Sequence, residues 1–192
     1  LYNHAFILRR RITYMDGFPV DDPEIVFKYR TTDMKKAQST DVRPRISGDY
    51  KIKFKIEMLP LKDRIGGVRR LLAHNVEFGL SQAPEADRLA MASLGHMTLV
   101  ELQNLFPPLE LITCEGPDDV ALVNQCIVEE LMQDICKLDF GHHLNATANL
   151  ALWRSRGDHR AFVGEFAYQL RFDAPASVNP TALRACELFF FE

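Results

Sequence analysis

Residues 50–58 read YKIKFKIEM, and this stretch decides the class of fold. Apolar residues alternate with charged residues without a break, which is the period of a β-strand with one apolar and one charged face. The charged positions are Lys51, Lys53, Lys55 and Glu57, and the apolar positions between and around them are Tyr50, Ile52, Phe54, Ile56 and Met58. The stretch therefore predicts a sheet whose two faces differ in chemistry.

The same alternation occurs twice nearer the N-terminus. In residues 5–14 (AFILRRRITY), Arg9 and Arg11 lie on one face of the predicted strand and apolar residues lie on the other. In residues 24–30 (EIVFKYR), Glu24, Lys28 and Arg30 lie on the face opposite to the apolar residues. The Asp16-Gly17 turn separates the two segments, so three early strands are predicted, each with its cations on one parity.

Further elements follow along the chain. Strands are predicted at residues 74–78, 109–114, 144–153 and 161–172, and the last two form an antiparallel hairpin around Gly157-Asp158. Helices are predicted at residues 84–94, after Thr98 and after Pro180. The strongest helix prediction is residues 118–137, where Val120, Val123, Ile127, Leu131 and Ile135 recur at spacings of three and four. Residues 61–72 stay open between a helix and strands.

These elements predict an α+β fold dominated by antiparallel sheet, in one domain over residues 1–192 with helices concentrated in 84–137. The 192 residues contain 47% hydrophobic and 26% charged residues, which is the balance of a folded protein. No apolar run is long enough to cross a bilayer and no leader pattern opens the chain, so a cytoplasmic protein without a membrane partner is expected. The four cysteines form no CxxC pair, which favours reduced thiols.

The net charge of −3 hides a division along the chain. Residues 1–72 carry 16 Lys and Arg against 9 Asp and Glu, so the excess of positive charge lies in the early strands. Aromatic residues are not interleaved with these cations, which argues against nucleic acid as a partner. No HExxH, GxSxG or P-loop motif occurs.

The strand faces allow two geometries. In the first, the apolar parity points inward and the cations are solvated. In the second, the sheet closes on itself, the apolar parity packs outward under the helices, and the cations line an interior tunnel that needs an anion to offset their repulsion. Carboxylates on the charged parities, Glu24, Glu57 and Glu165, could share in that role or hold a divalent cation.

In order and spacing, residues 5–172 resemble the CYTH, or triphosphate tunnel, superfamily. Residues 8–11 (LRRR) look like the LRxR strand of that family, and residues 25–28 (IVFK) look like its LTxK strand. The alternating residues 51–57 are similar to its charged third strand, and Glu165 in VGEFAY is similar to the acidic residue of its closing strand. The acidic ExExK strand that opens the family fold would lie upstream of Leu1.

The resemblance implies an antiparallel β-barrel of about eight strands with a few packed helices, which binds a triphosphate or another phosphate-rich small molecule. It implies Mg²⁺ or Mn²⁺ as cofactor, with Glu57 and Glu165 as catalytic residues and with Glu57, Glu165 and Glu24 as metal ligands. A metal-associated water would then attack the terminal phosphate. The substrate-binding residues would be Arg9, Arg11, Lys28, Arg30, Lys51, Lys53 and Lys55.

Two alternatives remain open at this stage. The same fold could be a binding or interaction module that holds polyanions without cleaving them. If the apolar parity faces inward instead, the protein could be an ordinary half-buried sheet or a lipocalin-like barrel for an apolar ligand.

Overall fold

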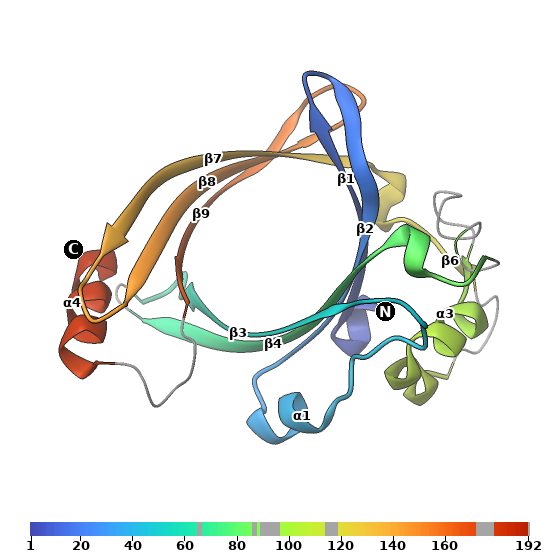
Figure 1. Cartoon of the computed structure of the whole chain (residues 1–192), viewed down its shortest axis with the longest axis horizontal. Helices are drawn as coiled ribbons and strands as arrows, with labels where there is room; N and C mark the ends of the chain where they lie inside the picture. The colour runs from blue at the N-terminus through green and yellow to red at the C-terminus, as the bar shows by residue number, and fades with distance from the viewer. Residues whose placement is uncertain (65–66, 86–87, 89–96, 114–118, 172–178, 192) are drawn as a thin grey trace. The chain divides into compact units, whose positions relative to one another are not determined.

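The computed structural model describes residues 1–64, 67–85, 88, 97–113, 119–171 and 179–191. Contacts divide the chain into two compact units, Leu1–Leu122 and Val123–Glu192. Antiparallel strands dominate both units and a few helices accompany them, which confirms the α+β class (Figure 1). The strands of the described residues form three separate sheets, and their hydrogen bonds do not close a barrel.

The first unit contains a four-stranded antiparallel sheet in the order β1-β2-β4-β3. Its strands are β1 (Phe6–Met15), β2 (Phe18–Thr31), β3 (Lys51–Pro60) and β4 (Val68–Gly79). The three predicted cationic strands are therefore confirmed. The strand predicted at residues 74–78 is also confirmed, as part of the longer β4. Residues 68–72, which belong to the segment 61–72 that the sequence did not assign, are part of the same strand.

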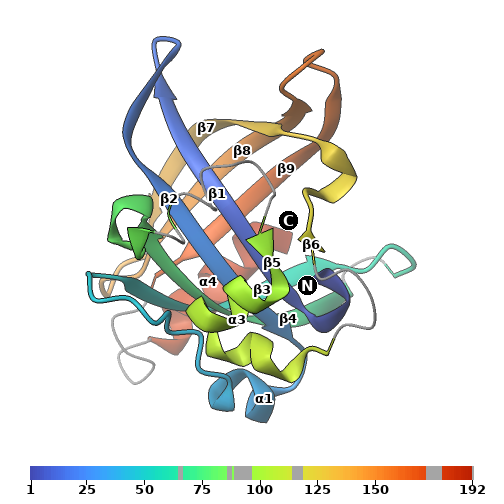
Figure 2. The same cartoon turned by 90° about the vertical axis from the view of Figure 1, so that its right-hand side faces the viewer.

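Short elements complete the first unit. The helices are α1 (Met34–Ser39) and α3 (Leu99–Leu105), and the 3-10 turns are η1 (Tyr2–His4), η2 (Leu80–Gln82) and η3 (Pro107–Leu111). A two-stranded sheet joins β5 (Met97–Thr98) to β6 (Asp119–Val120). Figure 2 shows the sheet from the side that faces these helices.

Helix α3 begins at a capping box, as its sequence predicts. The Glu101 amide donates to Thr98 Oγ1 at 3.2 Å, and the Glu101 carboxylate accepts from the Thr98 amide at 2.7 Å. These bonds satisfy amides that would otherwise lack a partner at the start of the helix. The helix ends at Leu105, ahead of Pro107.

The core of the first unit lies between the apolar face of the sheet and α3 with η3. Phe27 is fully buried at its centre, where its ring stacks 5.4 Å from that of Phe6 and 4.1 Å from that of Phe106. Leu102 and Leu105 reach this cluster from α3. Burying each such side chain contributes about 1.5–3 kcal/mol, which fixes the apolar face of β1, β2 and β4 against the helices. The opposite face of the sheet is the one that carries the cations.

The second unit is a three-stranded antiparallel sheet in the order β7-β8-β9 followed by a helix. Its elements are η4 (Val123–Gln125), β7 (Val128–Asp139), β8 (Asn145–Ser155), β9 (Ala161–Leu170) and α4 (Pro180–Phe191). The predicted hairpin of β8 with β9 and the C-terminal helix are both confirmed. A small core joins Leu144, Ala146 and Ala182, so α4 packs at one end of this sheet.

The helix predicted at residues 118–137 is wrong. From Val128 onward this segment is strand β7, which pairs with β8 along its whole length. The apolar spacing of four that suggested a helix is also an even number, so Ile127, Leu131 and Ile135 fit the period of a strand equally well. Cross-strand pairing with β8 decided between the two periods, with a bulge between Asp134 and Cys136.

The strand predicted at residues 109–114 is also wrong. Residues 109–111 belong to η3 and residues 112–113 to no regular element, and the Gln103 side-chain amide donates to the carbonyls of Leu109 and Ile112 at 3.1 and 2.9 Å. These carbonyls are satisfied by a side chain and not by a neighbouring strand. The helix predicted at residues 84–94 lies mostly outside the described residues. Within 84–137, the described residues contain α3, the 3-10 elements η3 and η4, and helical backbone at Glu85 and Arg88. No described helix is long and apolar enough to span a membrane.

Candidate functional site

The register of the four-stranded sheet gathers cations from three strands on one face. Lys28 on β2 stands opposite Asn75 on β4, which stands opposite Lys53 on β3. Two residues away along β4, Ala73 stands opposite Arg30 on β2 and Lys55 on β3. All seven predicted substrate-binding residues share this face: Arg9, Arg11, Lys28, Arg30, Lys51, Lys53 and Lys55. We call it the cationic face.

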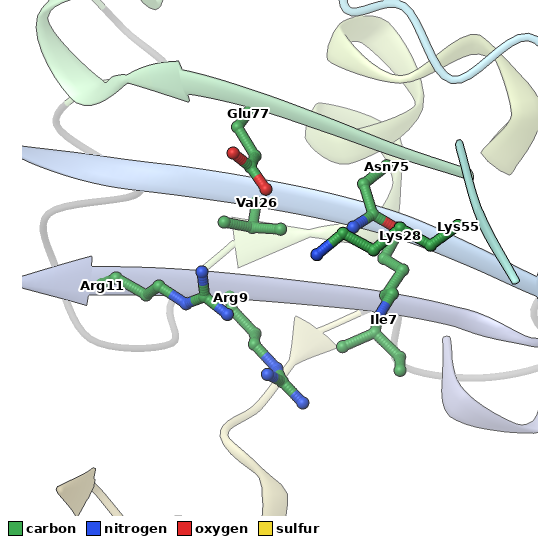
Figure 3. A pocket seen from close by; sticks show the side chains of 8 residues that line it. All are labelled: Ile7, Arg9, Arg11, Val26, Lys28, Lys55, Asn75 and Glu77. Atoms are coloured by element: carbon green, nitrogen blue, oxygen red, sulfur yellow. The ribbon is translucent and has the colours of Figure 1, made fainter. Parts of the chain in front are cut away.

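A pocket of about 60 Å³ opens on the cationic face (Figure 3). Its lining includes four cations from three strands and a single carboxylate, that of Glu77. The complete lining is Ile7, Arg9, Arg11, Val26, Lys28, Lys55, Asn75 and Glu77. Every one of these residues belongs to the first unit, so the pocket is complete within it.

Glu57 on β3 is held by two cations of β2, which lies on the other side of β4. Its Oε1 accepts from Lys28 Nζ at 2.7 Å, and its Oε2 lies 2.9 Å from a terminal nitrogen of Arg30. Burial acts to raise the pKa of Glu57, but the bonds and charges of Lys28 and Arg30 outweigh it and hold that pKa below its ordinary value. The carboxylate is therefore charged at neutral pH and is engaged through both oxygens.

Lys28 is the most enclosed cation of these ion pairs, with 13% of its side chain exposed. Burial lowers its pKa, and the neighbouring charges of Arg30 and Arg9 act in the same direction. Glu57 acts to raise this pKa but does not restore the ordinary value, so the shift has the opposite sign to that of a simple ion pair. The direction shows that positive charge is costly here, which is the property of a site that an anion would stabilise.

Two more carboxylates share the cationic face. Glu77 is buried in the pocket wall and forms an ion pair with Lys53. Glu24 on β2 lies 3.5 Å from the pocket-lining Arg11 on β1, in an exposed pair. Within the described ranges, Lys51 and Lys55 form no ion pair.

The cationic face also holds buried polar atoms without a partner. Among the described residues, these are the Nε of Arg30 and the Oδ1 of Asn75. Asn75 is 3% exposed and lines the pocket. Leaving such an atom unsatisfied costs about 1–3 kcal/mol, so both atoms mark a place where the protein does not complete its own hydrogen bonding.

The remaining predicted site residue, Glu165, lies on β9 in the second unit. Its carboxylate accepts from the Trp153 indole nitrogen at 3.2 Å. Sequence reasoning missed Asn75 and Glu77, the polar residues that alternate with Val76 and Phe78 along β4. The alternation within residues 74–78 is the signal that could have found them, once β4 was placed between two cationic strands.

The carboxylates of the first unit do not fit a divalent cation. A hard cation needs several oxygen ligands at one point. Both Glu57 oxygens are bound by cations, and Glu24 is paired with Arg11. Across the described part of the chain, no three His, Cys, Asp or Glu side chains come together as a metal site would require.

Comparisons with protein-family models, with curated proteins and with solved structures find no match for this chain. The resemblance to the triphosphate tunnel superfamily thus stays a prediction.

Proposed function

We propose that the protein binds a phosphate-rich small molecule, such as a triphosphate, on the cationic face of its four-stranded sheet. The observation that carries this proposal is the pocket lined by Arg9, Arg11, Lys28 and Lys55 with only Glu77 as a lining carboxylate. Cations held this close repel one another, and the repulsion is strongest where the surroundings exclude water. A bound anion removes that cost.

The size and chemistry of the pocket favour a phosphoryl group as the part of the ligand held there. A volume of about 60 Å³ accommodates about four to six water-sized groups, which is the scale of one phosphate. Arginine offers bidentate contacts to phosphate oxygens and lysine offers point-charge contacts. Arg30, Lys53 and Lys51 continue the positive charge along the same face, where further phosphates of one chain could lie.

The apolar-ligand alternative has less support. Such a ligand would need the apolar parity of the strands, and in β1, β2 and β4 that parity is covered by α3 and η3. The polyanion-binding module without catalysis agrees with the ion pairs of Glu57 and Glu24. Binding therefore forms the core of the proposal.

A closed tunnel and metal-dependent hydrolysis are the finer parts of the proposal. Glu165 keeps in this part of the proposal the catalytic and metal-binding role that the resemblance implies for it. Hydrolysis with Mg²⁺ or Mn²⁺ would need carboxylates beyond those of the first unit. Phosphate release from tripolyphosphate with either metal, measured beside a sample in EDTA, tests this part separately from binding.

Calorimetry with tripolyphosphate tests binding, and neighbouring arginines give a matched pair of variants. Arg9 lines the pocket, whereas Arg10 stands on the opposite face of the same strand. Arg9→Gln should weaken affinity about tenfold or more, because a charge-assisted hydrogen bond contributes about 1.5–3 kcal/mol. Arg10→Gln should leave it within about twofold. Equal losses in both variants, or no binding by the unmodified protein, would contradict the proposal.

A further inference from the structure

The contacts of Glu57 give it a role other than the metal ligand that the sequence predicts. It lies on β3, yet its oxygens contact Lys28 and Arg30 of β2, across the intervening β4. Lys28 is itself a pocket-lining residue. Two of the four pocket-lining cations are therefore already engaged by carboxylates of the same chain: Lys28 by Glu57 in an enclosed pair, and Arg11 by Glu24 in an exposed pair.

We propose that Glu57 is a displaceable counter-ion: it forms ion pairs with Lys28 and Arg30 in the unliganded protein and gives way to the anionic ligand. This inference rests on the proposed function, because it concerns the same pocket. It also explains the poor fit of Glu57 to a divalent cation, since its two oxygens serve two different cations.

Displacement is geometrically open to Glu57. In the described sheet β3 is an edge strand, so no further strand confines its side chains on that side. The Glu57 side chain is 20% exposed, which leaves it a path to water. Glu77 differs: it is 7% exposed on the central strand β4 and faces Lys53 from within the sheet. Of these two carboxylates, Glu57 is the one that can leave.

The role has a consequence for affinity that is opposite in sign to that of a metal ligand. While Glu57 is charged, a phosphate can bind Lys28 only by breaking the ion pair between Lys28 and Glu57. The bound phosphate then stays close to the negative charge of Glu57, which repels it. Glu57→Gln keeps the shape and one oxygen acceptor but removes the charge. The variant should bind the anion more tightly, and no metal is needed for the effect.

The experiment is calorimetry of the full chain with tripolyphosphate in EDTA, for the unmodified protein, Glu57→Gln and Glu24→Gln. We expect Glu57→Gln to raise affinity about tenfold. Glu24→Gln removes an equal charge from the longer, exposed pair with the pocket-lining Arg11, and because water screens that pair the affinity should change by about twofold at most. A rise in affinity of the same size in both variants would show that Glu57 acts only through the net charge of the face, and it would overturn the inference.

The other outcomes separate this inference from the proposed function. If the unmodified protein and both variants fail to bind, the proposed function falls and the role of Glu57 falls with it. If the unmodified protein binds and Glu57→Gln binds equally or more weakly in EDTA, only the role of Glu57 is overturned. A loss of affinity in Glu57→Gln that occurs solely with Mn²⁺ present would assign Glu57 to a metal instead.

A second variant covers the case in which Glu57→Gln does not fold, which near-ultraviolet circular dichroism would show. Glu57→Asp keeps the charge but shortens the side chain, so it cannot hold Lys28 and Arg30 together as Glu57 does. It should raise affinity by about two- to fivefold. Unchanged or weaker binding by Glu57→Asp would overturn the inference as well.

Discussion

Lys28 and Glu57 lie 2.7 Å apart at their charged ends although a whole strand separates them. Glu57 stands opposite Leu71 on β4, and Lys28 stands opposite Asn75, four residues further along that strand. On a flat sheet this offset would separate their Cα atoms by about 16 Å, and side chains perpendicular to the sheet would stay that far apart. The sheet must therefore curve with its cationic face on the inside of the bend, and Figure 1 shows this curvature across β2, β4 and β3.

The curvature gives Ala73 a steric role. It is fully buried on the cationic face of β4, where the register places it between Arg30 and Lys55. Ala73→Leu should push the flanking side chains apart and lower the free energy of unfolding by about 1–3 kcal/mol, while Ala73→Ser should cost less. Urea unfolding followed by circular dichroism measures both. Equal stability of the Leu variant and the unmodified protein would show that there is spare room above β4.

Two lysines of β3 should separate binding from stability. Lys55 lines the pocket without an ion pair to any described residue, so Lys55→Met should weaken tripolyphosphate binding about tenfold or more at nearly unchanged stability. Lys53→Met should also lower the free energy of unfolding, by about 1–3 kcal/mol, because it leaves the buried Glu77 carboxylate without its partner. The double variant Lys53→Met, Lys55→Met should abolish binding.

The matched control for these variants is Lys51→Met. Lys51 is on the same strand and face but does not line the pocket. It should weaken binding by about twofold to threefold, an effect that salt screens. If Lys51→Met reduces binding as much as Lys55→Met does, the pocket is not where the ligand makes its main contacts.

Glu57 should make stability depend on pH below neutrality. Its pKa is lower in the folded than in the unfolded chain, so its stabilising contribution is present above the unfolded value and is lost as pH falls through the folded one. The stability difference between the unmodified protein and Glu57→Gln should therefore be about 1–2 kcal/mol at pH 7 and should shrink as pH falls below the unfolded value of 4.5. Denaturant unfolding at a series of pH values checks this; a constant difference would refute it.

The capping box gives a prediction that is independent of any ligand. Thr98→Ala removes the side-chain acceptor for the Glu101 amide at the start of α3. Since α3 covers the apolar face of the sheet, the loss should appear as about 1 kcal/mol in the unfolding of the first unit. Thr98→Ser keeps the hydroxyl and should restore most of it. Thermal melts of the two variants measure the difference.

Glu165 tests the hydrolytic part of the proposal. Glu165→Gln keeps an acceptor for the Trp153 indole but loses the carboxylate charge. If Glu165 holds a metal, the variant should lose Mn²⁺-dependent phosphate release while tripolyphosphate affinity stays within about threefold. A greater loss of affinity than of hydrolysis would assign Glu165 to ligand binding instead.

The sequence predicted those features that a single strand's own alternation determines. Residues 51–57 could be assigned to a strand, and their cations to one face, because apolar and charged residues alternate there without exception. The ion-pair partners could not be predicted, because Glu57 reaches Lys28 only through the order β1-β2-β4-β3 and the bend of the sheet. Asn75 joins the site for the same reason.

The error at Val128–Asp139 has a related cause. A spacing of four suits a helix and a strand alike, and the partner that decides between them, β8, begins at Asn145 beyond the segment itself. The local spacing of apolar residues therefore predicts a helix or a strand correctly where it fits only one of the two periods. Where two periods fit, the long-range pairing decides.

Because β3 lies at the edge of its sheet, the lysines of this strand also affect how readily the protein aggregates. An edge strand has one row of backbone groups available to a second molecule, and β3 also exposes Ile52, Phe54 and Ile56. Lysines on such a strand discourage intermolecular strand pairing through mutual repulsion. The lysine variants that remove anion binding are therefore also the ones most prone to aggregate, and light scattering should accompany every titration made with them.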